Sequence, residues 1–103
     1  MDLGLHQRLF LLAVARYFKD SEKAYASLTE VEKTYAVVCE EFDEKPSSHT
    51  QVWNYIQFLS SIGIIRNRVT TSGGRSTQIS LPSIPATELE KQLSASFEEN
   101  GIV

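Results

Sequence analysis

The chain has 103 residues with a formal net charge of −3, and 42% of its residues are hydrophobic, as expected for one small soluble domain with its own core. Its single cysteine, Cys39, excludes an intramolecular disulfide and a cysteine metal cluster. The apolar run 9–15 is too short to cross a membrane and lacks the cleavage pattern of a signal peptide, so we expect a cytoplasmic protein.

Two helices are predicted in the first half of the chain. Residues 5–19 form the first, and its apolar residues extend around most of its circumference, which predicts burial on two sides. A short strand is predicted at 25–28. The second helix is predicted at 29–43, because Thr29 and Glu32 have the spacing of a capping box and apolar residues follow at helical spacing.

A third helix is predicted at 48–62. Ser48 and Gln51 have the spacing of another capping box, and Gly63 is well placed as the C-terminal stop. Apolar residues, among them Ile62, occupy one predicted face, and the opposite face is polar. The second and third helices, joined by a short polar turn, form a predicted helix-turn-helix.

After Gly63 the pattern alternates, which predicts a β-hairpin over 64–81 with a glycine-containing tip. A last helix is predicted at 87–100, with Thr87 and Glu90 as its capping box. A helix-turn-helix followed by a hairpin is the winged-helix arrangement. We therefore expect one α+β domain over 1–103, mostly helical: a winged helix with an extra C-terminal helix.

The motifs of catalysis are absent from the sequence. It contains no P-loop, HExxH or GxSxG pattern, and its two histidines, His6 and His49, lie far apart on different predicted helices. The acidic pairs on the helices are typical of solvated faces. We expect no enzyme activity, no cofactor and no metal site in this domain.

Charge distribution favours DNA as a partner. Residues 45–87 contain no Asp or Glu, although acids crowd both flanking regions. The start of the third helix offers hydroxyls and free backbone N–H groups to a phosphate, and two amide side chains that suit adenine follow. These candidate residues are Ser47, Ser48, His49, Thr50, Gln51 and Asn54. The alternative is an ordinary solvated face, since this helix carries no Lys or Arg.

The hairpin supplies the positive charge. Arg66 and Arg68 fall on one face of its first strand, and Arg75 follows the tip glycines. Glycines allow close approach to a groove, and arginine is favoured in a narrow minor groove. The alternative is a hairpin whose arginines only discourage aggregation. The candidate wing residues are Arg66, Arg68, Ser72, Gly73, Gly74 and Arg75.

Several segments occur in the order of a known family. They are LHQRL at 5–9 with LLAVAR at 11–16, YAVVCE at 35–40, PSSH at 46–49, LSSIGII at 59–65 and GRSTQISL at 74–81. Together they resemble the C-terminal winged-helix domain of archaeal replication-origin initiators, the relatives of origin recognition complex subunits and of the cell-division-cycle loader.

The resemblance implies a module of a larger AAA+ ATPase, with ATP and Mg bound only in a preceding ATPase region. It also implies that the third helix enters the major groove and the wing the minor groove of double-stranded origin DNA. Carried onto this chain, the DNA-facing residues are Ser48, His49, Thr50, Gln51, Gly73, Gly74 and Arg75. A replicative helicase or other initiator subunits are further expected partners of a monomeric, nucleoid-associated domain.

Two other functions fit the sequence. The first is a protein-interaction winged helix that docks a helicase or its own ATPase core, suggested by the acidic second helix, Trp53 and the broadly apolar first helix. The second is a stand-alone transcription regulator that dimerises through its terminal helices.

Overall fold

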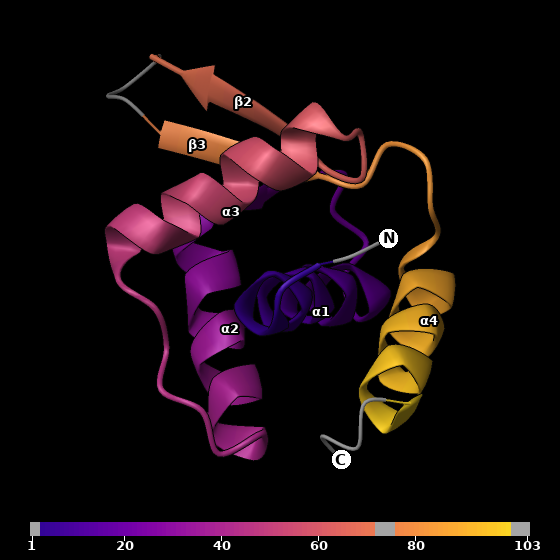
Figure 1. Cartoon of the computed structure of the whole chain (residues 1–103). Helices are drawn as coiled ribbons and strands as arrows, with labels where there is room; N and C mark the ends of the chain where they lie inside the picture. The colour runs from indigo at the N-terminus through magenta and orange to yellow at the C-terminus, as the bar shows by residue number, and fades with distance from the viewer. Residues whose placement is uncertain (1–2, 72–75, 100–103) are drawn as a thin grey trace.

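The computed structural model describes residues 3–71 and 76–99. Three antiparallel strands form one sheet in the order β1-β3-β2. The hairpin of β2 and β3 lies above the helices in Figure 1. The elements are α1 (Leu5–Lys19), β1 (Ala26–Ser27), α2 (Leu28–Glu41), α3 (His49–Ser61), β2 (Arg66–Thr70), β3 (Ser76–Ser80) and α4 (Ala86–Glu99). The fold is thus α+β and mostly helical, and the prediction of a winged helix with an extra C-terminal helix is confirmed.

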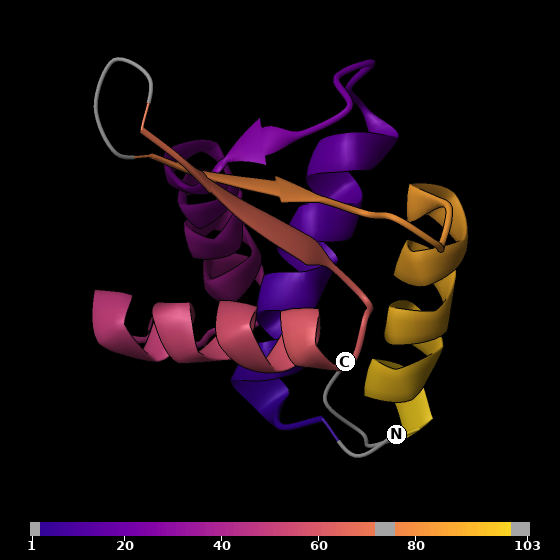
Figure 2. The ribbon, with the colours of Figure 1, turned by 90° about the horizontal axis from the view of Figure 1, so that it is seen from above.

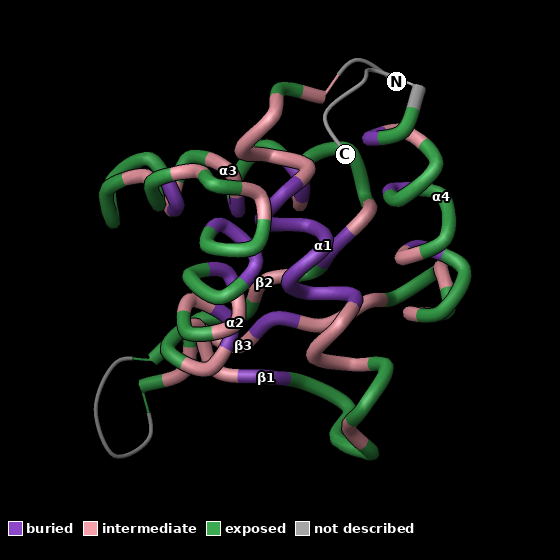
Figure 3. The backbone as a smooth tube through the Cα atoms, turned by 90° about the horizontal axis from the view of Figure 1, so that it is seen from below, coloured by how far each residue is buried: buried purple, intermediate pink, exposed green. Residues whose placement is uncertain are grey.

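The central helix α1 forms the core of the domain. All seven residues from Leu9 to Ala15 are buried, because α1 packs between α2 and α4 and also contacts α3 (Figure 3). Contacts within the chain therefore cover the broad apolar surface of α1, as its predicted burial on two sides requires. Among the described residues, no helix has both the length and the apolar character needed to cross a membrane.

The start of α2 differs from the prediction. Ser27 is the N-cap: its Oγ accepts from the Glu30 backbone N–H at 3.2 Å, and Glu30 Oε1 accepts from the Ser27 N–H at 3.2 Å. The predicted capping box of Thr29 and Glu32 is therefore wrong by two residues. The reason is the pairing of β1 with β3, which keeps Ser27 extended, so that the helix begins immediately after it.

The α2–α3 turn begins earlier than predicted, since α2 ends at Glu41. Asp43 adopts a positive φ of 54°, a conformation that Asp tolerates better than most residues. The Glu44 backbone N–H then donates to the Cys39 carbonyl at 2.8 Å and closes the end of the helix. This turn delivers the chain to the start of α3.

Both ends of α3 lie within one residue of the prediction, but the described contacts include only the Ser48 half of the predicted Ser48–Gln51 capping box. Ser48 Oγ caps the helix by accepting from the Gln51 backbone N–H at 3.3 Å, and Gly63 has a φ of +82° beyond its last turn.

The start of α4 does not follow the prediction. The helix begins at Ala86, where the Leu89 N–H donates to the Pro85 carbonyl, so Thr87 lies inside the first turn. Glu90 does not complete a capping box, because its carboxylate lies 2.8 Å from Lys19 Nζ and 3.5 Å from Arg16 Nε.

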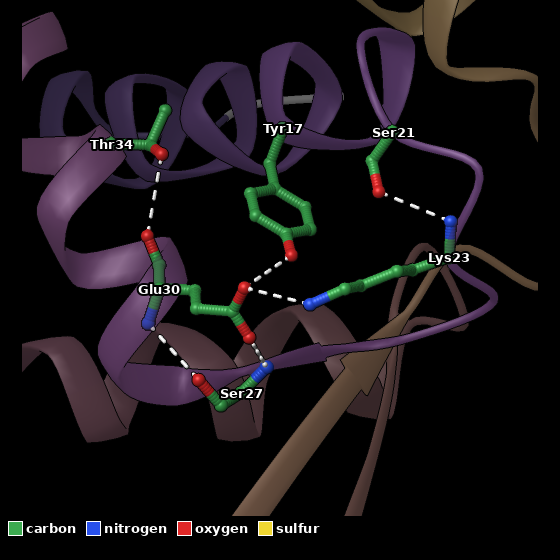
Figure 4. Close-up of polar contacts among 6 residues, drawn as sticks. All are labelled: Tyr17, Ser21, Lys23, Ser27, Glu30 and Thr34. Atoms are coloured by element: carbon green, nitrogen blue, oxygen red, sulfur yellow. Dashed lines mark hydrogen bonds and ion pairs between the residues drawn. The ribbon is translucent and has the colours of Figure 1, made fainter.

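A polar cluster fastens the end of α1 to the start of α2 (Figure 4). The Tyr17 hydroxyl donates to Glu30 Oε2 at 2.5 Å, and Lys23 Nζ lies 3.3 Å from the same oxygen. These contacts, first the Tyr17 hydrogen bond and then those from Ser27, lower the pKa of Glu30 from an ordinary 4.5 to about 2. The cluster therefore favours the ionised carboxylate in the folded protein.

Glu30 should make folding sensitive to acid. A folded-state pKa below the unfolded value gives stabilisation that is complete above about pH 4.5 and is lost as the pH falls toward 2. We expect Glu30→Gln to lower the urea midpoint at pH 6 and to reduce the further loss between pH 6 and pH 3. The control is Glu40→Gln, at an exposed position of the same helix. An equal acid-induced loss in wild type and Glu30→Gln would contradict this role.

Candidate nucleic-acid interface

The start of α3 is held by a buried tyrosine of α2. Tyr35 is 2% exposed, and its hydroxyl accepts from the Ser47 backbone N–H at 3.0 Å and lies 2.8 Å from His6 Nδ1. Ser47 Oγ lies 2.7 Å from the Tyr55 hydroxyl. Ser47 is therefore half-buried and doubly anchored, so that it positions the turn and does not offer a free hydroxyl to a ligand.

The other predicted residues of α3 lie on its exposed surface. Ser48 is exposed although its Oγ caps the helix, and the four that follow in the prediction are exposed as well: His49, Thr50, Gln51 and Asn54. They occupy the first two turns of a helix at the outside of the molecule (Figure 1). The amides of Gln51 and Asn54, one helical turn apart, can both face the same ligand.

Glu32 is a neighbour of α3 that the sequence pattern did not reveal. Its carboxylate lies 3.4 Å from His49 Nδ1. The predicted capping box had assigned this carboxylate to the start of its own helix. A negative charge therefore stands beside the N-terminus of α3, where only hydroxyls and N–H groups were expected.

A hollow lies between α3, the start of α2 and the hairpin. It is lined by Leu28, Glu32, His49, Trp53, Ser76 and Thr77, among others. Trp53 is half-buried and packs against the core beside this hollow. The hollow lies between the exposed start of α3 and the beginning of β3.

The outward surface of α3 also carries apolar side chains. Phe58 is 39% and Ile62 40% exposed, although the predicted stripe had placed Ile62 on the buried face. Ile62 is the C-cap residue, at the point where the chain turns away from the core toward β2. The i, i+4 spacing of this pair was the signal that could have revealed it. Such side chains can contact thymine methyl groups.

The hairpin places Arg66 and Arg68 together, exposed, on one face of β2, in agreement with their predicted alternation. Asn67, between them, points the other way: its Oδ1 accepts from Ser60 Oγ of α3 at 2.7 Å. The arginines therefore lie on the outer face of the sheet and do not converge with the polar face of α3. The remaining predicted wing residues, Ser72, Gly73, Gly74 and Arg75, lie outside the described residues.

The chain matches a known protein family over most of its length. The family model for the CDC6 C-terminal winged-helix domain matches residues 1–91 of this chain. The chain belongs to this family. The resemblance inferred from the ordered sequence segments is thereby confirmed, and a CDC6-type winged helix is not itself a catalytic domain.

Curated relatives of this CDC6-type winged helix are archaeal replication proteins. The ORC1-type DNA replication protein 2 of Sulfurisphaera tokodaii is 39% identical over 89 residues, which cover 84% of this chain and 21% of that protein. The protein of the same name from Saccharolobus solfataricus is 38% identical over 93 residues, covering 88% of this chain and 22% of that protein. The chain thus spans about a fifth of the length of these relatives.

Solved structures share the fold of the CDC6-type winged helix. The crystal structure of Cdc6p from Pyrobaculum aerophilum superposes with a TM-score of 0.86 at 37% identity, over 95% of this chain and 24% of that one. The Aeropyrum pernix ORC1 protein, solved in complex with DNA, gives a TM-score of 0.78 at 23% identity, over 98% of this chain and 26% of that one.

Proposed function

We propose that this domain binds double-stranded DNA at replication origins, with α3 in the major groove and the hairpin against the minor groove. The observation that carries the proposal is the exposed polar start of α3, which is held in place by Tyr35 and lies within the acid-free segment 45–87. Proteins of the same fold from Aeropyrum pernix and Drosophila were solved with DNA bound, which supports this use of the fold.

Each part of the proposed interface has its own task. Gln51 and Asn54 offer paired donors and acceptors to base edges, as adenine recognition requires. Arg66 and Arg68 lie on the outer face of β2, the edge strand of the sheet, where their long side chains can reach phosphates along the hairpin. Arg75, with Gly73 and Gly74, is assigned to the minor groove by analogy with the family.

The parent protein is the second part of the proposal. Because the curated relatives are several times longer, we place this domain in a longer initiator whose remaining region binds ATP and Mg. That region would add to the affinity for origin DNA. The domain itself is proposed to act as a monomer within the parent chain.

A salt titration tests the duplex interaction. Each neutralised phosphate contributes about −0.9 to the slope of log affinity against log salt, so three arginine contacts give a slope near −3. We expect the double variant Arg66→Gln/Arg68→Gln to reduce the slope by about two, as measured by fluorescence anisotropy with a labelled duplex. The control variant is Lys91→Gln, at an exposed position of α4.

The same titration separates DNA binding from a second candidate, docking of a helicase or another initiator subunit. The specific observation behind docking is Val37, 55% exposed on the acidic helix α2. Absence of salt-dependent duplex binding at low ionic strength would contradict the DNA proposal and favour docking through α2.

A further inference from the structure

The outer face of the sheet is a polar surface of its own. In β1 and β3 the residues that point inward, such as Ala26 and Ile79, are buried, and the alternate residues point outward. Arg66 pairs with Ser80, and Arg68 pairs with Gln78, which in turn pairs with Ser27. Figure 2 looks onto this face, with α1 behind the strands.

An exposed aromatic residue borders this face on the side opposite the arginines. Tyr25 immediately precedes β1, and continuing the β1–β3 register by one residue places it opposite Ser80. Its side chain is 53% exposed. Arg66, Ser80 and Tyr25 therefore form a row across the sheet, in which two strand spacings, about 10 Å, separate the arginine from the tyrosine.

A hollow opens at the tyrosine end of the face. Lys23, Tyr25, Ser27, Glu30, Ser76 and Gln78 contribute to its lining. The carboxylate of Glu30 already receives the Tyr17 hydroxyl and the Ser27 backbone N–H, with Lys23 Nζ at 3.3 Å. Its charge is compensated within the cluster, so the arginines set the charge of the rest of the face.

We propose that this outer face binds a single strand of DNA, with one base stacked on Tyr25 and the backbone following Arg66 and Arg68. Proteins that bind single strands combine cationic side chains along the backbone with aromatic side chains under the bases. The row on this sheet offers both kinds of group, and Gln78 lies between them as a donor and acceptor.

The chemistry of the face distinguishes a single strand from other occupants. Inside a duplex both faces of each base are covered by neighbouring bases, whereas the bases of a single strand can present a flat surface to Tyr25 along its length. A protein partner would need an apolar centre to its interface. The described outward positions here are polar apart from Tyr25 and the methyl of Thr70, whose hydroxyl is held 2.8 Å from Ser76 Oγ.

The proposal predicts a selective effect of the tyrosine. A fluorescein-labelled oligo(dT) of about a dozen nucleotides should bind the 103-residue chain at low salt, and Tyr25→Ala should weaken that binding by about 5-fold to 150-fold. Tyr25→Phe, which keeps the ring, should bind as wild type does. Val37→Ala, which removes another exposed apolar side chain, is the control for nonspecific effects.

Two results would overturn the single-strand site: no oligo(dT) binding by wild type at low salt, or equal binding by Tyr25→Ala and wild type. Circular dichroism verifies that each variant is folded. Because Tyr25 is exposed, its replacement should leave the fold intact. Asn54→Ala separates this site from the duplex interface, because it should leave oligo(dT) binding unchanged. If duplex binding failed and oligo(dT) binding did not, the function proposed for α3 would be contradicted. The single-strand site on the sheet would still stand or fall by the oligo(dT) measurements.

Discussion

Phe10→Ala is expected to lower the free energy of unfolding by about 3–5 kcal/mol, the range for removal of a buried aromatic side chain. Phe10 is fully buried in α1, and its ring lies edge-on to that of Tyr35, with 5.7 Å between ring centroids and 65° between ring planes. Truncation removes apolar contacts from the centre of the core and leaves a cavity beside the tyrosine.

This loss would be a large share of the stability of the domain. Domains of this kind have unfolding free energies of about 5–15 kcal/mol. Urea denaturation followed by circular dichroism measures the change, and Val37→Ala, at a 55% exposed position, should stay within about 0.5 kcal/mol of wild type. A Phe10→Ala variant as stable as wild type would contradict the conclusion that the buried residues of α1 form the core of the domain.

The same substitution should disturb α3. Phe10 supports the ring of Tyr35, whose hydroxyl accepts from the Ser47 N–H at the start of that helix. The Tyr35 phenol is protonated at neutral pH, because its ordinary pKa of 10.0 is already well above 7 and burial raises that pKa further. Loss of its packing should therefore broaden or shift the amide resonance of Ser47 before the domain unfolds.

Asn54→Ala is expected to remove sequence preference from duplex binding. A bidentate contact from an amide to a base is worth about 1–3 kcal/mol of discrimination, which corresponds to about 5-fold to 150-fold in affinity. Asn54 is exposed on α3, and Gln51, one turn earlier, is exposed beside it. The affinity for a preferred duplex should fall by this factor, and that for random duplex should change little.

The measurement needs a preferred duplex, obtained by selection from a random library with the wild-type domain. Anisotropy titrations at one fixed salt concentration then compare the selected and random duplexes, because affinities depend steeply on salt. Gln92→Ala, at an exposed amide of α4, is the matched control. Equal losses on both duplexes would show that Asn54 contacts the backbone or supports the fold and does not read bases.

The helices and the hairpin could be predicted because their signals are local. The limits of α1 and the cap of α3 follow from apolar spacing and from single polar residues at the ends, which act through the backbone of the same helix. The order of these elements was enough to predict a winged helix, since a helix-turn-helix with a following hairpin has few other arrangements.

The predicted helix caps were wrong where a contact with a residue distant in sequence decided the helix start or bound the capping side chain. The start of α2 was set by pairing of β1 with β3, a strand some fifty residues later in the chain, and Ser27 displaced Thr29 as the cap. Glu90 had the spacing to cap α4, but Lys19 and Arg16 of α1 hold its carboxylate. Both contacts join residues far apart in sequence, which local spacing does not reveal.

The sequence by itself determined which residues share a surface: the polar side chains of α3 on one side, and Arg66 with Arg68 on another. Only the tertiary structure decided how those surfaces are oriented. The hydrogen bond from Ser60 to Asn67 places both arginines on the outer face of the sheet, and Tyr35 holds Ser47 in a half-buried position. Alternation and helical periodicity relate neighbours within an element, whereas packing between elements decides which side meets the core and which meets a ligand.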